Sequence, residues 1–175
     1  MRISILCLFS LATLAAADKP VEIPAHKPSL MPEGTKVTGT YGTEAGQGFE
    51  NLLDGKDDTV CSGGPGTGNG DVLRIRFVFP KGVAKVVGIT LGASDKFHNY
   101  FPHEIEVAAD TGTGKFDTVL GTIRDLGPGQ KTYGQYPLCK PVGVKEIEVR
   151  ITKYEQGKGV KRAPQISDIG LLVAR

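Results

Sequence analysis

Residues 72–79 read Val-Leu-Arg-Ile-Arg-Phe-Val-Phe, and this stretch decides the fold class. Apolar residues occupy every odd-numbered position from 73 to 79, and Arg74 and Arg76 stand between the first three of them. Successive side chains of a β-strand point to opposite faces, so apolar residues at every second position mark one buried face. The pattern therefore predicts a strand that lies on a core.

Apolar residues at every second position recur further along the chain. Ile147, Val149 and Ile151 alternate with charged residues, and Glu104–Val107 alternates as well. The 24 glycines and 11 prolines are spread along the chain as turn residues, and no long window has a helical stripe. Repeated short strands between Gly/Pro turns predict an all-β fold, an antiparallel β-sandwich or jelly roll. Further strands are expected at Val83–Leu91, Phe116–Ile123, Val144–Thr152 and Ile166–Val173.

Residues 1–17 have the parts of a secretory signal peptide. Arg2 gives a basic start, Ile3–Leu14 is largely apolar, and Ala15–Ala17 closes the run with small residues. A membrane-spanning helix needs about 20 apolar residues, so an uncleaved membrane anchor is the weaker alternative. Residues 18–35 are rich in proline and predict an extended arm or linker. Residues 36–175 then form one domain of a secreted, extracellular protein.

The charge of the chain is close to balanced, which excludes some classes of partner. The chain has 21 Lys and Arg against 19 Asp and Glu, and the two signs are mixed along it. A nucleic-acid-binding domain usually carries a basic footprint, which is missing here. No loop presents a clear spike of large apolar residues, so binding to membrane lipid is not expected either.

The three cysteines indicate whether the protein forms a disulfide in an oxidising compartment. Cys7 lies in the signal peptide, which leaves Cys61 and Cys139 in the mature chain. An even number of cysteines in an oxidising compartment favours a Cys61–Cys139 disulfide. Two unpaired buried thiols are the alternative.

Residues 49–59, Phe-Glu-Asn-Leu-Leu-Asp-Gly-Lys-Asp-Asp-Thr, contain three aspartates within five residues of sequence. Hard cations such as calcium take six to eight oxygen ligands from carboxylates, carbonyls and hydroxyls. The spacing does not match an EF-hand, because no glutamate closes a loop of the right length. By itself, such an acidic turn is a weak signal and is more often a solvated loop.

The segment NLLDGKDDT (residues 51–59) resembles the opening signature of discoidin domains and of the related galactose-binding-like carbohydrate-binding modules. The resemblance continues in order and spacing to about residue 173, and it implies a galactose-binding-domain-like β-sandwich. The segments that carry it further are DVLRIRFVF (71–79), VVGITL (86–91), HEIEVAADTG (103–112), GVKEIEVRIT (143–152) and ISDIGLLV (166–173).

In that family a structural calcium ion joins the first loop to the last strand. The family usually has a glutamate where this chain has Asp168, and the shorter side chain loosens the site or admits a water. The family also has an aromatic residue, often tryptophan, shortly after the loop threonine, whereas this chain has Val60 and Cys61 and contains no tryptophan. The resemblance implies carbonyl ligands from Asn51, Lys56, Thr59 and Ser167, a hydroxyl from Thr59, and carboxylates from Asp54 and Asp168.

The sugar-binding relatives hold their ligand on loops at one end of the sandwich. Here Asn99 falls near a position where many of them keep an asparagine, and Lys96 is the base nearest to their missing arginine. Tyr154 could replace the aromatic residue that stacks on the sugar ring. The alternatives are that Tyr100 is a core residue at a strand entry and His98 an ordinary surface histidine. The candidate ligand-binding residues are Lys96, His98, Asn99, Tyr100 and Tyr154.

Nothing in the sequence predicts an enzyme, since both the GxSxG and the HExxH motifs are absent. A basic patch at Lys158, Lys161 and Arg162 is compatible with an anionic partner or with a merely solvated loop. We therefore expect a secreted, non-catalytic carbohydrate-binding module with a structural calcium site, whose partner is a glycan or a cell-surface or extracellular protein. The alternatives are a discoidin-like adhesion or protein-interaction domain and a small all-β polysaccharide-active enzyme. The sequence carries no signal of an oligomeric state.

Overall fold

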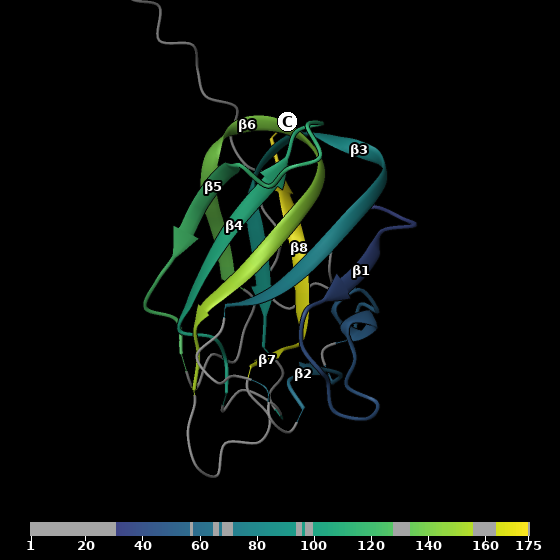
Figure 1. The fold of residues 1–175 in the computed structure, drawn as a ribbon, viewed down its shortest axis with the longest axis vertical. Helices are drawn as coiled ribbons and strands as arrows, with labels where there is room; N and C mark the ends of the chain where they lie inside the picture. Colours follow the sequence, from purple (N-terminus) through teal and green to yellow (C-terminus); the bar gives the residue numbers. More distant parts are fainter. Residues whose placement is uncertain are drawn as a thin grey trace, which may run out of the picture.

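Two long strands, β3 (Leu73–Gly92) and β6 (Gly134–Lys153), organise the computed structural model and run through both of its layers (Figure 1). They pair antiparallel, with shifts of register between Val78 and Val83 and again on either side of Val86. Such irregularities bend a strand and increase its twist, so each long strand contributes one half to each layer. The structure describes residues 31–56, 58–64, 67, 72–93, 96, 100–127, 134–155 and 164–174.

The two layers make an antiparallel β-sandwich, which confirms the predicted all-β class. One layer has the strand order β1-β3-β6-β4-β5, and in the other β8 pairs with the second half of β3. Residues 61–62 and 165–166 form a separate two-stranded sheet, β2-β7. The remaining bounds are β1 (Lys36–Gly39), η1 (a 3-10 helix, Phe49–Leu52), β2 (Cys61–Ser62), β4 (Glu104–Asp110), β5 (Thr118–Ile123), β7 (Gln165–Ile166) and β8 (Asp168–Val173).

The core lies between the layers and is built from alternate residues of each strand. Ile75 and Phe77 are fully buried, whereas Arg74 and Arg76 keep nearly half of their side chains exposed on the outer face. The opposite layer contributes side chains such as Leu171 of β8 to the same core. The alternation in residues 72–79 therefore predicts the buried face correctly. Within the described residues, no helix has the length and apolarity needed to cross a membrane.

The extent of the long strands differs from the sequence-based expectation. The sequence suggests separate strands at 72–79 and 83–91, with Pro80 and Gly82 between them, yet the structure keeps one continuous strand through both. Gly82 has a φ of 68°, and the pairing with β6 resumes directly at Val83 and Val144. Because the neighbouring strand bends with it, β3 turns from one layer to the other without a loop.

The predicted disulfide is wrong, because both cysteines are free. Cys61 lies in β2 and pairs with Ile166. Cys139 lies in β6, with its Sγ 3.7 Å from the carbonyl of Val86, and Val86 pairs with Val173. The extended chain from Ile166 to Val173 spans roughly 20 Å, whereas a disulfide needs Cα atoms within about 7 Å. The two thiols thus lie at opposite ends of β8.

Candidate functional site

The acidic turn after η1 gathers oxygen atoms around the hydroxyl of Thr59. This hydroxyl donates to the Asp54 carboxylate, with 3.0 Å to Oδ1 and 2.9 Å to Oδ2, and lies 3.2 Å from the carbonyl of Lys56. The backbone amide of Lys56 donates to Asp54 Oδ1 at 2.9 Å. Gly55 allows this tight turn with a φ of 69°, a conformation that favours glycine. The turn therefore brings together three of the six predicted metal-binding residues.

Asn51 closes the same loop with its side chain. Its Nδ2 donates to the carbonyl of Val60 at 2.8 Å and to the carbonyl of Gly46 at 3.2 Å. The resemblance assigns to Asn51 only a backbone carbonyl ligand. In the structure the side-chain amide also braces the loop, because it links the two ends of the 51–60 segment. The sequence alone did not predict this role.

The β2-β7 sheet brings the other two predicted metal-binding residues to this loop. Cys61 pairs with Ile166 in an antiparallel register. The residues before Cys61 therefore run beside those after Ile166, which places Thr59 toward Asp168. Asp168 is completely buried, and η1 lies beside β8. Segments more than a hundred residues apart in sequence thus meet at one place.

The chemistry of this place suits a hard cation. Calcium prefers carboxylate, carbonyl and hydroxyl oxygens, and these are the donors that Asp54, Lys56, Thr59 and Asp168 supply. The hydroxyl of Ser167 is buried and has no hydrogen-bond partner within the described residues. No three His, Cys, Asp or Glu side chains gather anywhere in the described part of the chain, so a cation here would depend on backbone and hydroxyl oxygens as well.

The candidate sugar loop is only partly described, because His98 and Asn99 lie outside the described residues. Lys96 is exposed. Tyr100 is half-buried against the core, and its carbonyl accepts a hydrogen bond of 2.9 Å from the amide of Gln165. Tyr154 is only 7% exposed and belongs to the main core, so it lacks the open ring face that a stacking residue needs. The basic residues Lys158, Lys161 and Arg162 also lie outside the described residues.

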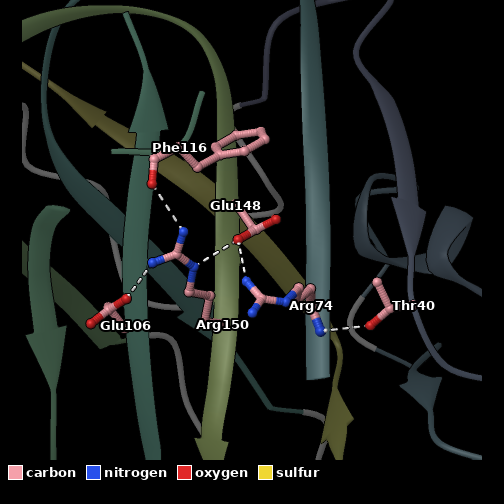
Figure 2. A network of polar contacts seen from close by, with 6 residues as sticks. All are labelled: Thr40, Arg74, Glu106, Phe116, Glu148 and Arg150. Carbon is pink, nitrogen blue, oxygen red and sulfur yellow. Dashed lines mark hydrogen bonds and ion pairs between the residues drawn. The ribbon is translucent and has the colours of Figure 1, made fainter. Parts of the chain in front are cut away.

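A network of ion pairs covers the outer face of the layer formed by β3, β6 and β4 (Figure 2). Arg150 donates to Glu148 at 2.6 Å, to Glu106 at 2.7 Å and to the carbonyl of Phe116 at 3.0 Å. Arg74 donates to Glu148 at 2.8 Å, and its backbone amide donates to the Thr40 hydroxyl at 3.1 Å. Each charge already has a partner of opposite sign. We therefore interpret this face as a structural brace between strands.

The thiols are not activated as nucleophiles. Burial raises the pKa of Cys61 to about 12, and its Sγ lies 3.8 Å from the hydroxyl of Tyr41. Burial also raises the pKa of Cys139. The thiolate is the nucleophilic form of cysteine, so both residues stay protonated at neutral pH. His103, the histidine within the described residues, has its Nε2 3.5 Å from Glu155 Oε2.

Comparison with known proteins identifies the fold. Neither a protein-family model nor a curated protein matches the chain by sequence. Among solved structures, the family 32 carbohydrate-binding module of Clostridium perfringens NanJ, solved with galactose, matches 79% of this chain and 92% of its own, with a TM-score of 0.57 and 17% identity. Another C. perfringens family 32 module, solved with GalNAc-β-1,3-galactose, matches 80% of this chain and 95% of its own, with a TM-score of 0.63 and 11% identity.

An F5/8 type C domain from Bacteroides fragilis matches 87% of this chain and 99% of its own, with a TM-score of 0.62 and 14% identity. The chain therefore has the fold of family 32 carbohydrate-binding modules and F5/8 type C (discoidin) domains over most of its length. This confirms the predicted resemblance at the level of the fold.

Proposed function

We propose that this chain is a secreted, non-catalytic carbohydrate-binding module. The observation that carries the proposal is the match, over about four fifths of the chain, to modules solved with galactose and with GalNAc-β-1,3-galactose. The ligand class that follows is a glycan that contains galactose or GalNAc. The proposed contact region is the loop from Lys96 to Tyr100, which includes Asn99.

The same proposal includes a structural calcium ion at the turn that begins at Asp54. The carboxylates of Asp54 and Asp168, the hydroxyl of Thr59 and the carbonyl of Lys56 would hold it. Support comes from the convergence of the Asp54 and Lys56 oxygens on Thr59 and from the complete burial of Asp168. Carboxylate, carbonyl and hydroxyl oxygens are the ligands that calcium prefers.

Several features support a binding role over a catalytic one. The described thiols are protonated, and the carboxylates on the outer sheet face, such as Glu106 and Glu148, are held by Arg150. General acid–base catalysis needs a titratable group that is free to exchange a proton with a substrate. Glu106 and Glu148 are instead engaged in ion pairs with Arg150.

A second candidate is a discoidin-like adhesion or protein-interaction domain. The match to the F5/8 type C domain favours it to the same degree as the family 32 matches favour glycan binding, because all of them share one fold. Fold alone does not choose between these ligands. The choice depends on what the loop around Tyr100 binds.

The test is a glycan array followed by calorimetric titration of galactose, GalNAc and their disaccharides with the mature chain. We expect binding that Asn99→Ala reduces at least tenfold while the melting temperature stays close to that of the wild type. Tyr100→Phe keeps the ring that packs against the core and tests the hydroxyl alone. Thr111→Ala is the matched control, since Thr111 is exposed and follows β4 at the other end of the sandwich. An array without hits, together with capture of an extracellular protein, would favour the adhesion domain. Turnover of a polysaccharide would contradict both.

A further inference from the structure

An open groove lies where the long strands β3 and β6 bend from one layer to the other. Figure 1 shows both bends at the end of the sandwich opposite β2 and β7. Residues 81–83 of β3, residues 143–145 of β6 and the turn after β4 line the groove. Its volume of about 440 Å³ lies within the usual range of small-ligand sites, roughly 300–1,000 Å³.

The charge of this groove is positive. Lys81 and Lys145 are the charged residues that line it, and both are exposed. Neither lysine forms an ion pair within the described residues. Asp110, at the start of the turn, is buried, and its Oδ1 accepts three backbone amides of that turn. An adjoining groove, which Lys81 also lines, contains Glu33, so the charge there is mixed.

The register of the two strands brings the lysines together. Val83 of β3 pairs with Val144 of β6. Lys81 precedes this pair on one strand and Lys145 follows it on the other, so both lie on the same side of it in the antiparallel ladder. The turn after β4 also positions Lys145, because a Cβ at Gly112 would lie 3.8 Å from the Nζ of this lysine.

Two glycines leave space beside the lysines. Gly82 has a φ of 68°, a conformation that favours glycine. Gly143 is different, because a Cβ there would come no closer than 3.9 Å to its nearest neighbour, the carbonyl oxygen of Val83. A larger residue therefore fits at position 143 without strain, and its side chain would occupy the groove.

We propose that this groove binds the acidic group of an anionic glycan, a sugar chain that carries carboxylate or sulfate groups. The ammonium groups of Lys81 and Lys145 bind the acidic group from two sides. Lysine acts as a compact point charge without a fixed fork geometry, so the groove accepts a carboxylate and a sulfate alike. The choice of a glycan as the carrier rests on the proposed function, whereas the attraction of an anion rests on the two lysines.

This site differs from the candidate sugar loop in place and in ligand. That loop ends at Tyr100, whose carbonyl is bonded to β7, at the opposite end of the sandwich (Figure 1). A nucleic acid also presents acidic groups, but its binding needs a broad basic footprint. The chain has 21 basic against 19 acidic residues, mixed along the sequence. Two lysines in one groove suit a ligand with separate acidic groups.

The test is calorimetric titration of three galactose-based oligosaccharides of equal length into the mature chain that carries Asn99→Ala. One oligosaccharide is neutral, one contains galacturonate and one is sulfated. Asn99→Ala removes the proposed loop site, so the remaining binding belongs to another place. We expect the acidic oligosaccharides to bind and the neutral one not to bind. The affinity should fall as the salt concentration rises from about 0.05 M to about 0.3 M, and the tighter acidic ligand identifies the preferred group.

Substitutions in the same background locate the binding. Lys81→Gln and Lys145→Gln should each weaken it roughly threefold to tenfold, because each removes one charged contact. Lys140→Gln is the matched control, since Lys140 is exposed on the same strand as Lys145 but does not line the groove, and it should change the affinity less than about twofold. Gly143→Gln keeps every charge and should weaken binding by filling the groove. All four variants should melt within roughly 2 °C of the parent.

The outcomes separate this proposal from the proposed function. Equal weakening by Lys140→Gln and Lys145→Gln, or full affinity in Gly143→Gln, would overturn the groove, because the attraction would then be a general effect of charge. Acidic ligands that bind the wild type but not Asn99→Ala would belong to the loop. If neutral galactose binds the wild type and no acidic ligand binds Asn99→Ala, the groove proposal fails alone.

Discussion

The backbone amide of Gln165 donates a hydrogen bond of 2.9 Å to the carbonyl of Tyr100, so the candidate sugar loop is fixed to β7. The amide of Ser167 donates at 2.9 Å to the carbonyl of Gly92, at the other end of the same loop. β7 in turn pairs with β2, which directly follows the acidic turn. The two proposed sites are therefore joined by one short ladder of backbone hydrogen bonds.

From this ladder we predict that calcium strengthens glycan binding without touching the glycan. The ion would fix the segment before β2, and β2 and β7 would then hold the ends of the loop that closes at Tyr100. Titration of galactose with calcium-loaded protein should give an affinity several times higher than titration in the presence of a chelator. Equal affinities in the two titrations would show that the ladder is rigid without the ion.

Calcium should also stabilise the fold through Asp54. A ligand that binds only the folded state, at a hundred times its dissociation constant, contributes about 2.7 kcal/mol, which corresponds to a rise in melting temperature of roughly 5–10 °C. Asp54→Ala should abolish the rise, because it removes a carboxylate ligand. Asp58→Ala removes the same charge from the same loop and should keep the rise. A wild-type melting curve that the chelator leaves unchanged would refute the site.

The outer-face network predicts unequal roles for two arginines. Arg150 keeps 20% of its side chain exposed and links Glu148 with Glu106, whereas Arg124 keeps 69% exposed and pairs with Glu104. Arg150→Ala should lower the free energy of unfolding by about 2 kcal/mol, because it breaks charge-assisted hydrogen bonds within β6, to β4 and to the carbonyl of Phe116. Arg124→Ala should cost less than about 1 kcal/mol, as exposed pairs do. Urea unfolding of the two variants measures the difference, and equal losses would contradict this account.

The turn after β4 predicts part of the acid sensitivity of the protein. The Oδ1 of Asp110 accepts hydrogen bonds from the backbone amides of Gly112, Thr113 and Gly114, and these bonds, with the charge of Lys145, lower the pKa of its carboxyl group. Since the folded pKa lies below the unfolded value of about 3.9, this contribution is complete above that pH and is lost as the pH falls through the folded pKa.

Asp110→Asn removes that titration while it keeps an oxygen acceptor. The variant should lose less stability than the wild type between pH 5 and pH 2, as measured by melting temperature. Asp117→Asn, at an exposed aspartate close to the same turn, should follow the wild-type curve. If the melting temperature of Asp110→Asn falls with pH as steeply as that of the wild type, the three backbone hydrogen bonds do not depend on the charge of Asp110.

A side chain at Gly88, where β3 pairs with Pro137 of β6, should destabilise the fold. A Cβ at this position would overlap the carbonyl oxygen of Tyr136 and crowd the Cα of Pro137, and both are backbone atoms that cannot move aside. Gly88→Ala should therefore cost about 2–3 kcal/mol. Gly42→Ala is the control, because nothing lies within 4 Å of its Cβ position, and it should change stability by less than about 0.5 kcal/mol. Similar losses in both variants would contradict the steric argument.

Short sequence patterns correctly predicted those features that are formed by residues adjacent along the chain. The alternation at Arg74 and Arg76 identified the outward face of β3, because the period of two is a property of the extended backbone itself. The turn at Asp54 and Gly55 was predictable for the same reason, since it is made within a few residues. The bracing hydrogen bonds of the Asn51 side chain were not predictable, because its acceptors, Gly46 and Val60, are chosen by how the loop closes.

The pairing of Cys61 with Cys139 failed as a prediction because an even count of thiols says nothing about distance. The two cysteines lie near opposite ends of β8 because of how the strands pair. The register of that pairing depends on which side chains fill the space between the layers. The burial of Tyr154 has the same origin, since this residue directly follows β6 and packs into the main core.

By itself, the sequence determined the β class, the inward face of each alternating segment and the acidic turn, because each of these is decided by residues adjacent along the chain. Only the tertiary structure decided that two strands would bend through both layers and that Asp168 would come to the turn at Asp54. These features depend on packing and register between segments distant in sequence, where the free energy of burying side chains outweighs any local preference.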